Sequence, residues 1–125
     1  MAQNKLLRFC PVALVLTTPT NIINPTITSL AGVVGFTATQ PYVIIRHVRI
    51  VNITASAATC TFAVGTTGVT PTSANSVIGF GLSVAANSYV DWYGQLRLDA
   101  ADFLVGFANT TLALTFEGEG EIGFI

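Results

Sequence analysis

The chain has 125 residues, of which 51% are hydrophobic and only 9% are charged, and its formal net charge is −1. A domain of this length buries about two thirds of the surface that its unfolded chain exposes, so it sustains one compact core without disulfide or metal staples. The charge balance argues against non-specific nucleic-acid binding, which needs many Lys and Arg to replace phosphate counterions, and no apolar run approaches the about 20 residues of a membrane-spanning helix.

The N-terminal 41 residues lack a regular hydrophobic period. The stretch "TTPTNIINPTITSLAGVVGFTATQP" is rich in proline, which cannot donate a hydrogen bond in a central strand. We therefore predict that residues 1–41 form an N-terminal arm and edge segment, and that residues 42–125 form the core domain. Because an uncharged apolar arm is rarely left in water, we expect it to pack against another subunit. Its candidate interface residues are Leu6, Leu7 and Phe9.

The middle of the chain predicts two strands. Residues 42–54, "YVIIRHVRIVNIT", are dense in β-branched side chains, which favour a long strand. The small polar stretch "NITASAAT" that follows is typical of a hairpin turn leading to the second strand, "TCTFAV". That strand alternates, with Cys60, Phe62 and Val64 on the face that we expect to meet a core, and Thr and Ala on a face that meets something polar.

The rest of the chain reads as a loop followed by short strands. Residues 65–76, "GTTGVTPTSANS", are dominated by Gly, Pro, Ser and Thr and predict a loop. The later apolar segments, separated by Asn, Gly or an Asp-containing turn, are "VIGFGLSVAA", "SYVDWYG", "QLRL", "DFLVGFA" and "TLALTFEGEGEI". About seven or eight strands at this spacing, with no convincing helix, predict an all-β fold, a single-domain, jelly-roll-like β-sandwich.

The chemistry-bearing residues do not suggest a catalytic constellation. His47, the only histidine, lies in a predicted strand with no nucleophile motif near it, and we interpret it as a surface or interface residue. Asp99 and Asp102 bracket a two-alanine turn, where Asp side chains accept backbone hydrogen bonds. Cys10 and Cys60, with a single histidine, cannot form a zinc site, and we interpret them as small buried residues. We expect no enzymatic activity and no cofactor.

Two asparagines match the acceptor pattern for glycosylation. Asn52 begins "NIT" and Asn109 begins "NTT". Without a credible signal peptide, we interpret them as strand-end and turn residues.

Three acids near the end of the chain form a regular series. Glu117, Glu119 and Glu121 alternate with Gly118 and Gly120, and alternate residues of a strand point the same way. Carboxylates in such a row need water, a cation or a neighbour's basic groups against them. Calcium is disfavoured, because positions along one strand do not converge on one point. Two interpretations stay open, contact with a partner's Lys or Arg and a solvated edge that resists aggregation.

Trp92 and Tyr93 are adjacent aromatic residues in a predicted strand. One of the two rings must then face away from the core, and exposed aromatic rings often anchor interfaces. The alternative is that one ring closes the end of the sandwich. Our candidate interface residues here are Trp92, Tyr93, Glu117, Glu119 and Glu121.

Two stretches carry a resemblance to known proteins, "RHVRIVNITASAATCTFAVGTTG" and "DWYGQLRLDAADFLVGFANTTLALTFEGEGEIGF". A strand ending in Asn, a small-residue turn, an apolar strand and a Gly/Thr loop precede a leucine-rich strand, an acidic turn, an apolar strand and an acidic ending. This layout, over residues 42–124, resembles the small β-sandwich virion proteins of tailed bacteriophages. The resemblance implies a particle component and brings no catalytic residues, and it does not cover residues 1–41.

The composition itself points to a protein that is packed among partners. A chain with few charges, many Thr, Ser and Asn and an apolar arm is typical of a subunit packed among others, since obligate interfaces are apolar and poor in charge. Together with the resemblance, this predicts a structural virion protein, either a capsid decoration protein or a minor capsid protein. It would reinforce the shell as a homo-oligomer, for instance a trimer, against the major capsid protein or other virion proteins.

Two alternatives stay open. One is a head-tail or tail-surface protein, and the other is a glycan- or receptor-binding module that stacks Trp92 and Tyr93 on sugar rings. We expect the chain in the virion, after assembly in the bacterial host cytoplasm, without a nucleic-acid or membrane partner.

Overall fold

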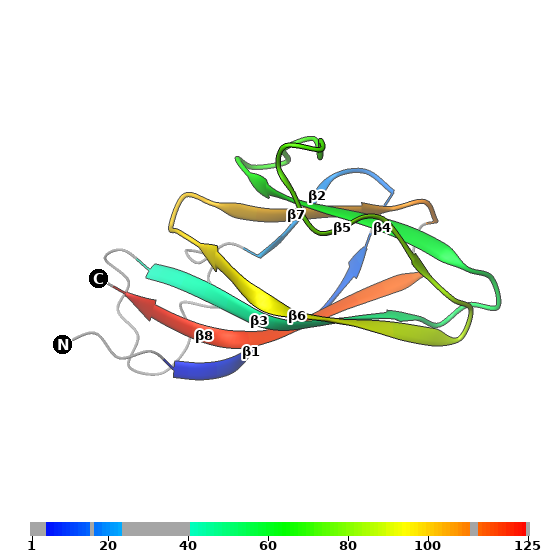
Figure 1. Ribbon diagram of the computed structural model, residues 1–125, viewed down its shortest axis with the longest axis horizontal. Coiled ribbons are helices and arrows are strands. Elements are labelled where there is room, and N and C mark those ends of the chain that lie inside the picture. The colour runs from blue at the N-terminus through cyan, green and yellow to red at the C-terminus, as the bar shows by residue number, and fades with distance from the viewer. Residues whose placement is uncertain (1–4, 16, 24–40, 111–112, 125) are drawn as a thin grey trace.

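The computed structural model describes residues 5–15, 17–23, 41–110 and 113–124, and it is all-β. The strands form two antiparallel four-stranded sheets that lie face to face as two layers (Figure 1). Sheet A has the order β1 (Lys5–Val15), β8 (Leu114–Phe124), β3 (Pro41–Asn52) and β6 (Ser88–Leu98). Sheet B has the order β2 (Thr20–Ile23), β7 (Phe103–Ala108), β4 (Ala58–Gly65) and β5 (Ser76–Val84). The predicted all-β sandwich is confirmed.

The strands pair like one long antiparallel ribbon folded at the connection between β4 and β5. From this hairpin outward, β4 pairs with β5, β3 with β6, β2 with β7 and β1 with β8. Two further pairings, β3 with β8 and β4 with β7, join the rolled ribbon into the two sheets. Every connection except that between β4 and β5 therefore passes from one layer to the other.

The hairpin predicted at "NITASAAT" is wrong, because β3 lies in sheet A and β4 lies in sheet B. Asn52, at the end of β3, is buried, and its side-chain amide donates to the carbonyl oxygens of Ser56 (2.8 Å) and Val84 (3.1 Å). Its Oδ1 accepts from the backbone N–H of Thr54 (2.9 Å). These bonds satisfy the backbone of a bend between layers. Small polar residues suit such a bend as well as they suit a hairpin, so composition did not separate the two.

The loop predicted at residues 65–76 is confirmed as the connection between β4 and β5. Asn21 of β2 holds this loop from outside. Its Nδ2 donates to Thr67 Oγ1 (2.7 Å), and its Oδ1 accepts from the backbone N–H of Gly68 (2.8 Å). Gly68 has a φ of 62°, a left-handed conformation that glycine adopts without steric cost. The long loop is therefore tied to the edge of sheet B.

The hydrophobic core lies between the sheets. Phe62 of β4 and Phe116 of β8 are fully buried, and their rings meet at 5.5 Å between centroids with a tilt of 52°. The alternation predicted for β4 is confirmed on its core face, since Cys60 is buried with Phe62 and Val64 packs against them. The other large core side chains come from both sheets and are Ile23, Val43, Ile45, Val48, Ile50, Leu98, Leu104, Leu114 and Ile122.

The described part of the N-terminal segment lies at the edges of the sheets. β1 is an edge strand of sheet A and β2 is an edge strand of sheet B. Residues 1–4 and 24–40 of the predicted arm lie outside the described residues, and the boundary at residue 41 stays a prediction. Within the described ranges, no helix is long and apolar enough to span a bilayer.

Candidate functional site

Charged side chains gather on the outer face of sheet A. Its central strand β3 carries Arg46, His47 and Arg49, between the acidic strand β8 on one side and Asp91 of β6 on the other. The register places His47 opposite Glu119 and Arg49 opposite Asp91. Oppositely charged cross-strand pairs of this kind favour one antiparallel register. We call these residues, with Tyr89, Tyr93, Glu117 and Glu121, the charged cluster.

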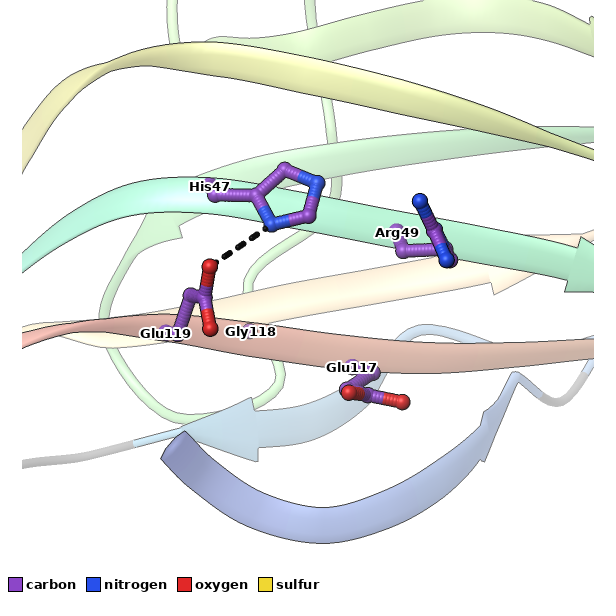
Figure 2. A pocket seen from close by; sticks show the side chains of 5 residues that line it. All are labelled: His47, Arg49, Glu117, Gly118 and Glu119. Carbon is purple, nitrogen blue, oxygen red and sulfur yellow. Dashed lines mark hydrogen bonds and ion pairs between the residues drawn. The ribbon is translucent and has the colours of Figure 1, made fainter. Parts of the chain in front are cut away.

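His47 lies between two carboxylates. Its Nε2 is 2.9 Å from Asp91 Oδ1, and its Nδ1 is 3.1 Å from Glu119 Oε1, the contact drawn in Figure 2. Because a carboxylate only accepts, the doubly protonated ring satisfies both contacts, whereas the neutral ring satisfies one. Burial alone would lower the pKa of His47, but its hydrogen bonds to Asp91 and Glu119 and their negative charges outweigh burial. The pKa of His47 is therefore raised above its ordinary value of 6.5.

Asp91 connects the two basic side chains of β3. Arg49 donates to it from Nε (2.8 Å to Oδ1) and from Nη2 (3.1 Å to Oδ2), a bidentate pair. The hydrogen bond from Arg49 and then that from His47 lower the pKa of Asp91 to about 2. The Arg49 guanidinium also lies 4.3 Å from the centre of the Tyr89 ring, within cation–π range. Asp91 is thus ionised throughout the neutral range and fixes the side chains beside it.

The predicted row of glutamates lies along β8. The glycines between the acids are buried, as expected for the opposite face of the strand. At Gly120 an added Cβ would lie 2.0 Å from the carbonyl oxygen of Ile44 on β3, so only glycine fits there without moving backbone. The alternation of Glu and Gly therefore serves two faces at once, with acids outside and close strand contact inside.

Basic side chains of the same chain meet two of the glutamates, a possibility that the sequence interpretation did not consider. Glu119 contacts His47, and Glu121 accepts hydrogen bonds from the Arg46 guanidinium. A shallow hollow of about 180 Å³ opens beside them, lined by His47, Arg49, Glu117, Gly118 and Glu119 (Figure 2). In the part of the chain that the structure describes, no three His, Cys, Asp or Glu side chains are grouped to hold a metal ion.

The cluster acts as a charge bridge across three strands. When His47 is an imidazolium, both of its N–H groups donate to carboxylates and neither nitrogen has a lone pair left to accept a proton. His47 then links β3 to β6 and to β8. Histidine is the side chain whose ordinary pKa lies nearest to neutral pH, and the pKa of His47 is raised from that value.

Trp92 and Tyr93 point to opposite sides of sheet A. Trp92 is partly buried against the core, and its ring lies over Gly94, where an added Cβ would come within 2.6 Å of the ring. Tyr93 is 72% exposed on the outer face and stacks on His47, with centroids 4.6 Å apart. One ring therefore faces away from the core, as predicted. The two rings do not form a common platform.

The remaining predicted interface residues belong to β1. The register places Leu6 opposite Glu121, Leu7 opposite Gly120 and Phe9 opposite Gly118. Their side chains, like that of Cys10, lie outside the described part of the molecule, so their role in an interface stays a prediction.

The turn interpretations of Asp102 and Asn109 are confirmed. Asp99 lies in the predicted turn, but its carboxylate accepts from Arg97 Nε (2.8 Å). The backbone N–H of Asp99 donates to Asp102 Oδ2 (2.9 Å), and the backbone N–H of Asp102 donates to the carbonyl oxygen of Asp99 (2.9 Å). Asn109 Oδ1 accepts from the backbone N–H of Thr59 (2.9 Å). Cys60 is a free buried thiol whose pKa is raised to about 12 by burial.

Sequence reasoning missed Arg46, Arg49 and Asp91 as members of one cluster. The signal in the sequence is the alternation of basic and apolar residues in "RHVRI" together with a single acid in "VDWY". Joining these stretches needs the register between β3 and β6, which the alternation alone does not contain. No family model matches the chain, and neither a curated protein nor a solved structure matches it.

Proposed function

We propose that this chain is a non-enzymatic structural protein of a tailed-phage virion, a capsid decoration or minor capsid protein that binds and reinforces the shell. Its partners are further copies of itself and the major capsid protein or other virion proteins. A place at the head-tail junction or on the tail surface is the alternative within the same class.

The distribution of charge carries this proposal. Strands β2, β4, β5 and β7 of sheet B contain no Asp, Glu, Lys, Arg or His as described, whereas every strand of sheet A contains such residues. Ala63 and Val105 of sheet B are buried within the chain itself, but exposed positions of the same layer, such as Asn21 and Ser83, carry no charge either. Interfaces between permanent partners are depleted in charge, because burying an unpaired charge is costly.

The strand order supports a jelly-roll description. Eight strands, paired from a central hairpin outward and shared between the sheets β1-β8-β3-β6 and β2-β7-β4-β5, agree with a ribbon rolled into two Greek keys. Jelly rolls of this size are used by viral capsid proteins and by lectins. The topology therefore suits the proposal without selecting it alone.

A glycan-binding module is less favoured by the geometry. That alternative stacks Trp92 and Tyr93 together on sugar rings, but Trp92 packs toward the core and Tyr93 is turned outward. A sugar-binding surface on sheet A would have to use Tyr93 without Trp92.

The proposal is tested by measuring the amount of this chain in purified phage particles whose genome encodes it. We expect quantitative mass spectrometry to find it in a fixed ratio to the coat protein, and we expect particles assembled without it to disrupt at lower temperature. A chain that is absent from particles and remains a soluble monomer in the lysate would overturn the proposal. The experiment needs the full chain, because removing residues 1–41 also removes β1 and β2 from the two sheets.

A further inference from the structure

Three exposed hydrophobic side chains lie in an uncharged part of the chain. Ile53 is 65% exposed, Phe80 is 65% exposed and Tyr89 is 53% exposed. All three belong to the segment 50–90, which contains no charged residue and no histidine. Large exposed apolar groups favour contact with another protein surface, and in the described part of the chain only Tyr89 of these three has a charged group against it, the Arg49 guanidinium at 4.3 Å from the ring centre.

Phe80 stands on a bulge of β5, the edge strand of sheet B. Val77 pairs with Phe62 and Leu82 pairs with Cys60, so residues 78–81 face one residue of β4, Thr61. The backbone N–H of Gly81 donates to Thr61 Oγ1 (2.9 Å), which anchors the base of the bulge.

The backbone of this bulge is strained. Ile78 has a φ of 67°, which a β-branched residue rarely adopts. Strain of this kind persists where it has a use, and bulges re-aim side chains. Bulges also protect sheet edges from pairing, but charged residues usually assist that protection. Here the side chain presented is a phenylalanine.

A shallow, open hollow of about 350 Å³ lies at one end of sheet A. Its lining is uncharged and consists of Val51, Asn52, Ile53, Asn87, Ser88 and Tyr89. The backbone around it is hydrogen-bonded, with the N–H of Ile53 donating to Ala113 O (3.3 Å) and that of Asn87 donating to Thr54 O (2.9 Å). The hollow is therefore preformed rather than made by a loose loop.

We propose that Phe80 of one copy of this chain inserts into the Val51–Ile53–Tyr89 hollow of a second copy. Phe80 does not line the hollow of its own chain. The knob and the hollow are different surfaces, so the contact is heterologous and passes from copy to copy, either closing a ring or continuing as a row. This contact would be the interface of the homo-oligomer in the proposed function. It rests on the proposed function only for its place in a virion, because the self-association itself can be tested without particles.

A second copy is the occupant that electrostatics favours. The side chains that line the hollow carry no charge, and the Arg49 guanidinium over the Tyr89 ring is already paired with Asp91. A charged partner would therefore lose hydration there and gain little from an ion pair. The surface of β5 around Phe80 is uncharged, so both sides lose little on contact. One aromatic ring buries far less than the area of a standard stable interface, so we expect weak association in free solution. Attachment to a common shell would raise the effective concentration and strengthen it.

The experiment measures association of the purified full chain by sedimentation equilibrium, up to about 1 mM. The variants are Phe80→Ser for the knob and Ile53→Ser for the hollow, with Phe80→Leu and Ile53→Val as matched controls that keep an apolar side chain. Both positions are mostly exposed, so the folds should survive, which circular dichroism checks. We expect each serine variant to weaken association at least about tenfold, and each control to stay within about threefold of the wild type.

Mixing the two serine variants gives the decisive result. Phe80→Ser keeps its hollow and Ile53→Ser keeps its knob, so an equal mixture should form pairs that cannot grow further. Association that survives in Ile53→Ser alone would mean that Phe80 meets another surface, and it would overturn the proposal, as would a wild-type chain that stays monomeric throughout. Particle occupancy is measured separately, so a chain that self-associates but is absent from virions would contradict only the proposed function.

Discussion

The two sheets of this sandwich differ in the charge of the side chains that they carry. All charged residues of the chain except Asp99 and Asp102 lie in the strands of sheet A. On the outer face of that sheet, Arg49 and His47 are matched to Asp91 and Glu119 across strand pairs. Sheet B has no such pairs. Its outer side is organised by neutral bonds, such as those of Asn21 to Thr67 and Gly68 and that of Gly81 to Thr61.

The stabilities of the two layers should therefore depend on different solution conditions. Exposed ion pairs weaken as salt rises, and a histidine held between carboxylates responds to pH near neutrality. Neutral hydrogen bonds and apolar contacts are not screened by ions and do not titrate. Substitutions in one sheet, measured at different pH and salt, should show whether the stability of each layer depends on the other.

The largest effect is expected from Phe62→Ala. Phe62 belongs to sheet B and contacts Phe116 of sheet A, so its removal opens a cavity in the core that both layers share. The loss should be about 3–5 kcal/mol in the free energy of unfolding. Denaturation followed by circular dichroism and by fluorescence of Trp92, the only tryptophan, should show one common shift.

Phe107→Ala is the control for that experiment. Phe107 lies opposite Thr61 on β7 and is only partly buried, so truncating it should cost less than truncating Phe62. For Phe62→Ala, the contradicting result is a transition by circular dichroism that moves while the transition by Trp92 fluorescence stays in place. Sheet A would then fold without sheet B, and the shared core would not be what joins the layers.

Asn52→Ala should have the next largest effect. The amide of Asn52 in sheet A donates to the carbonyl oxygen of Val84 in sheet B, so it joins the layers at one end. Removing it leaves buried backbone groups without a partner, at a cost of about 1–3 kcal/mol. Thermal denaturation should show the loss. Ser56→Ala is the control, because only the backbone oxygen of Ser56 takes part, and its effect should stay within about 0.5 kcal/mol.

The sequence predicted the elements of the fold better than their partners. Apolar alternation located β4, and turn residues located the loop of residues 65–76, because both signals are local. The bend after Asn52 was assigned to a hairpin because a two-residue period states which face a side chain takes and not which strand lies beside it. Whether the chain passes from β3 to the other sheet depends on how all the strands pack around the core, which a local pattern does not contain.

The candidate site shows the same limit. The outward row of glutamates follows from alternation in one strand, and the structure has it. The bridge from Asp91 through His47 to Glu119 joins residues separated by 44 and 72 positions. Both contacts also depend on a register shift between Ile45 and His47 in β3, which sets the residues that His47 faces. A bulge of this kind changes which side chains share a face, and no local pattern predicted it.

A smaller effect, confined to sheet A, is expected from pH. The pKa of His47 is raised in the folded chain above 6.5, so its stabilisation is fully present below pH 6.5 and is lost as pH rises through the folded pKa. The free energy of unfolding should therefore fall over that window, by about 1 kcal/mol or less because the site is near the surface. His47→Gln should flatten the dependence.

Nuclear magnetic resonance gives a direct check, since one histidine produces one titration curve. Glu119→Gln removes one carboxylate and should lower the pKa of His47, and Asp91→Asn should lower it as well. A wild-type His47 that titrates at or below 6.5 would contradict the two-carboxylate bridge. A change in the pH dependence on altering Thr61 of sheet B would show that the layers are not electrostatically separate.

The smallest effect is expected at the pair of Arg46 and Glu121. Both are on the outer face, and the Arg46 side chain is 48% exposed, so solvent screens the attraction. A double-mutant cycle with Arg46→Gln and Glu121→Gln should give a coupling of about 0.5 kcal/mol or less at low salt, falling toward zero at about 1 M salt. Asn21→Ala in sheet B is the matched neutral case, and its cost should be the same at both salt concentrations. If the Asn21 variant proved as salt-sensitive as the ion pair, the contrast between a charge-bridged layer and a neutral one would lose its physical basis, because ionic screening acts on charge and sheet B has none in its strands.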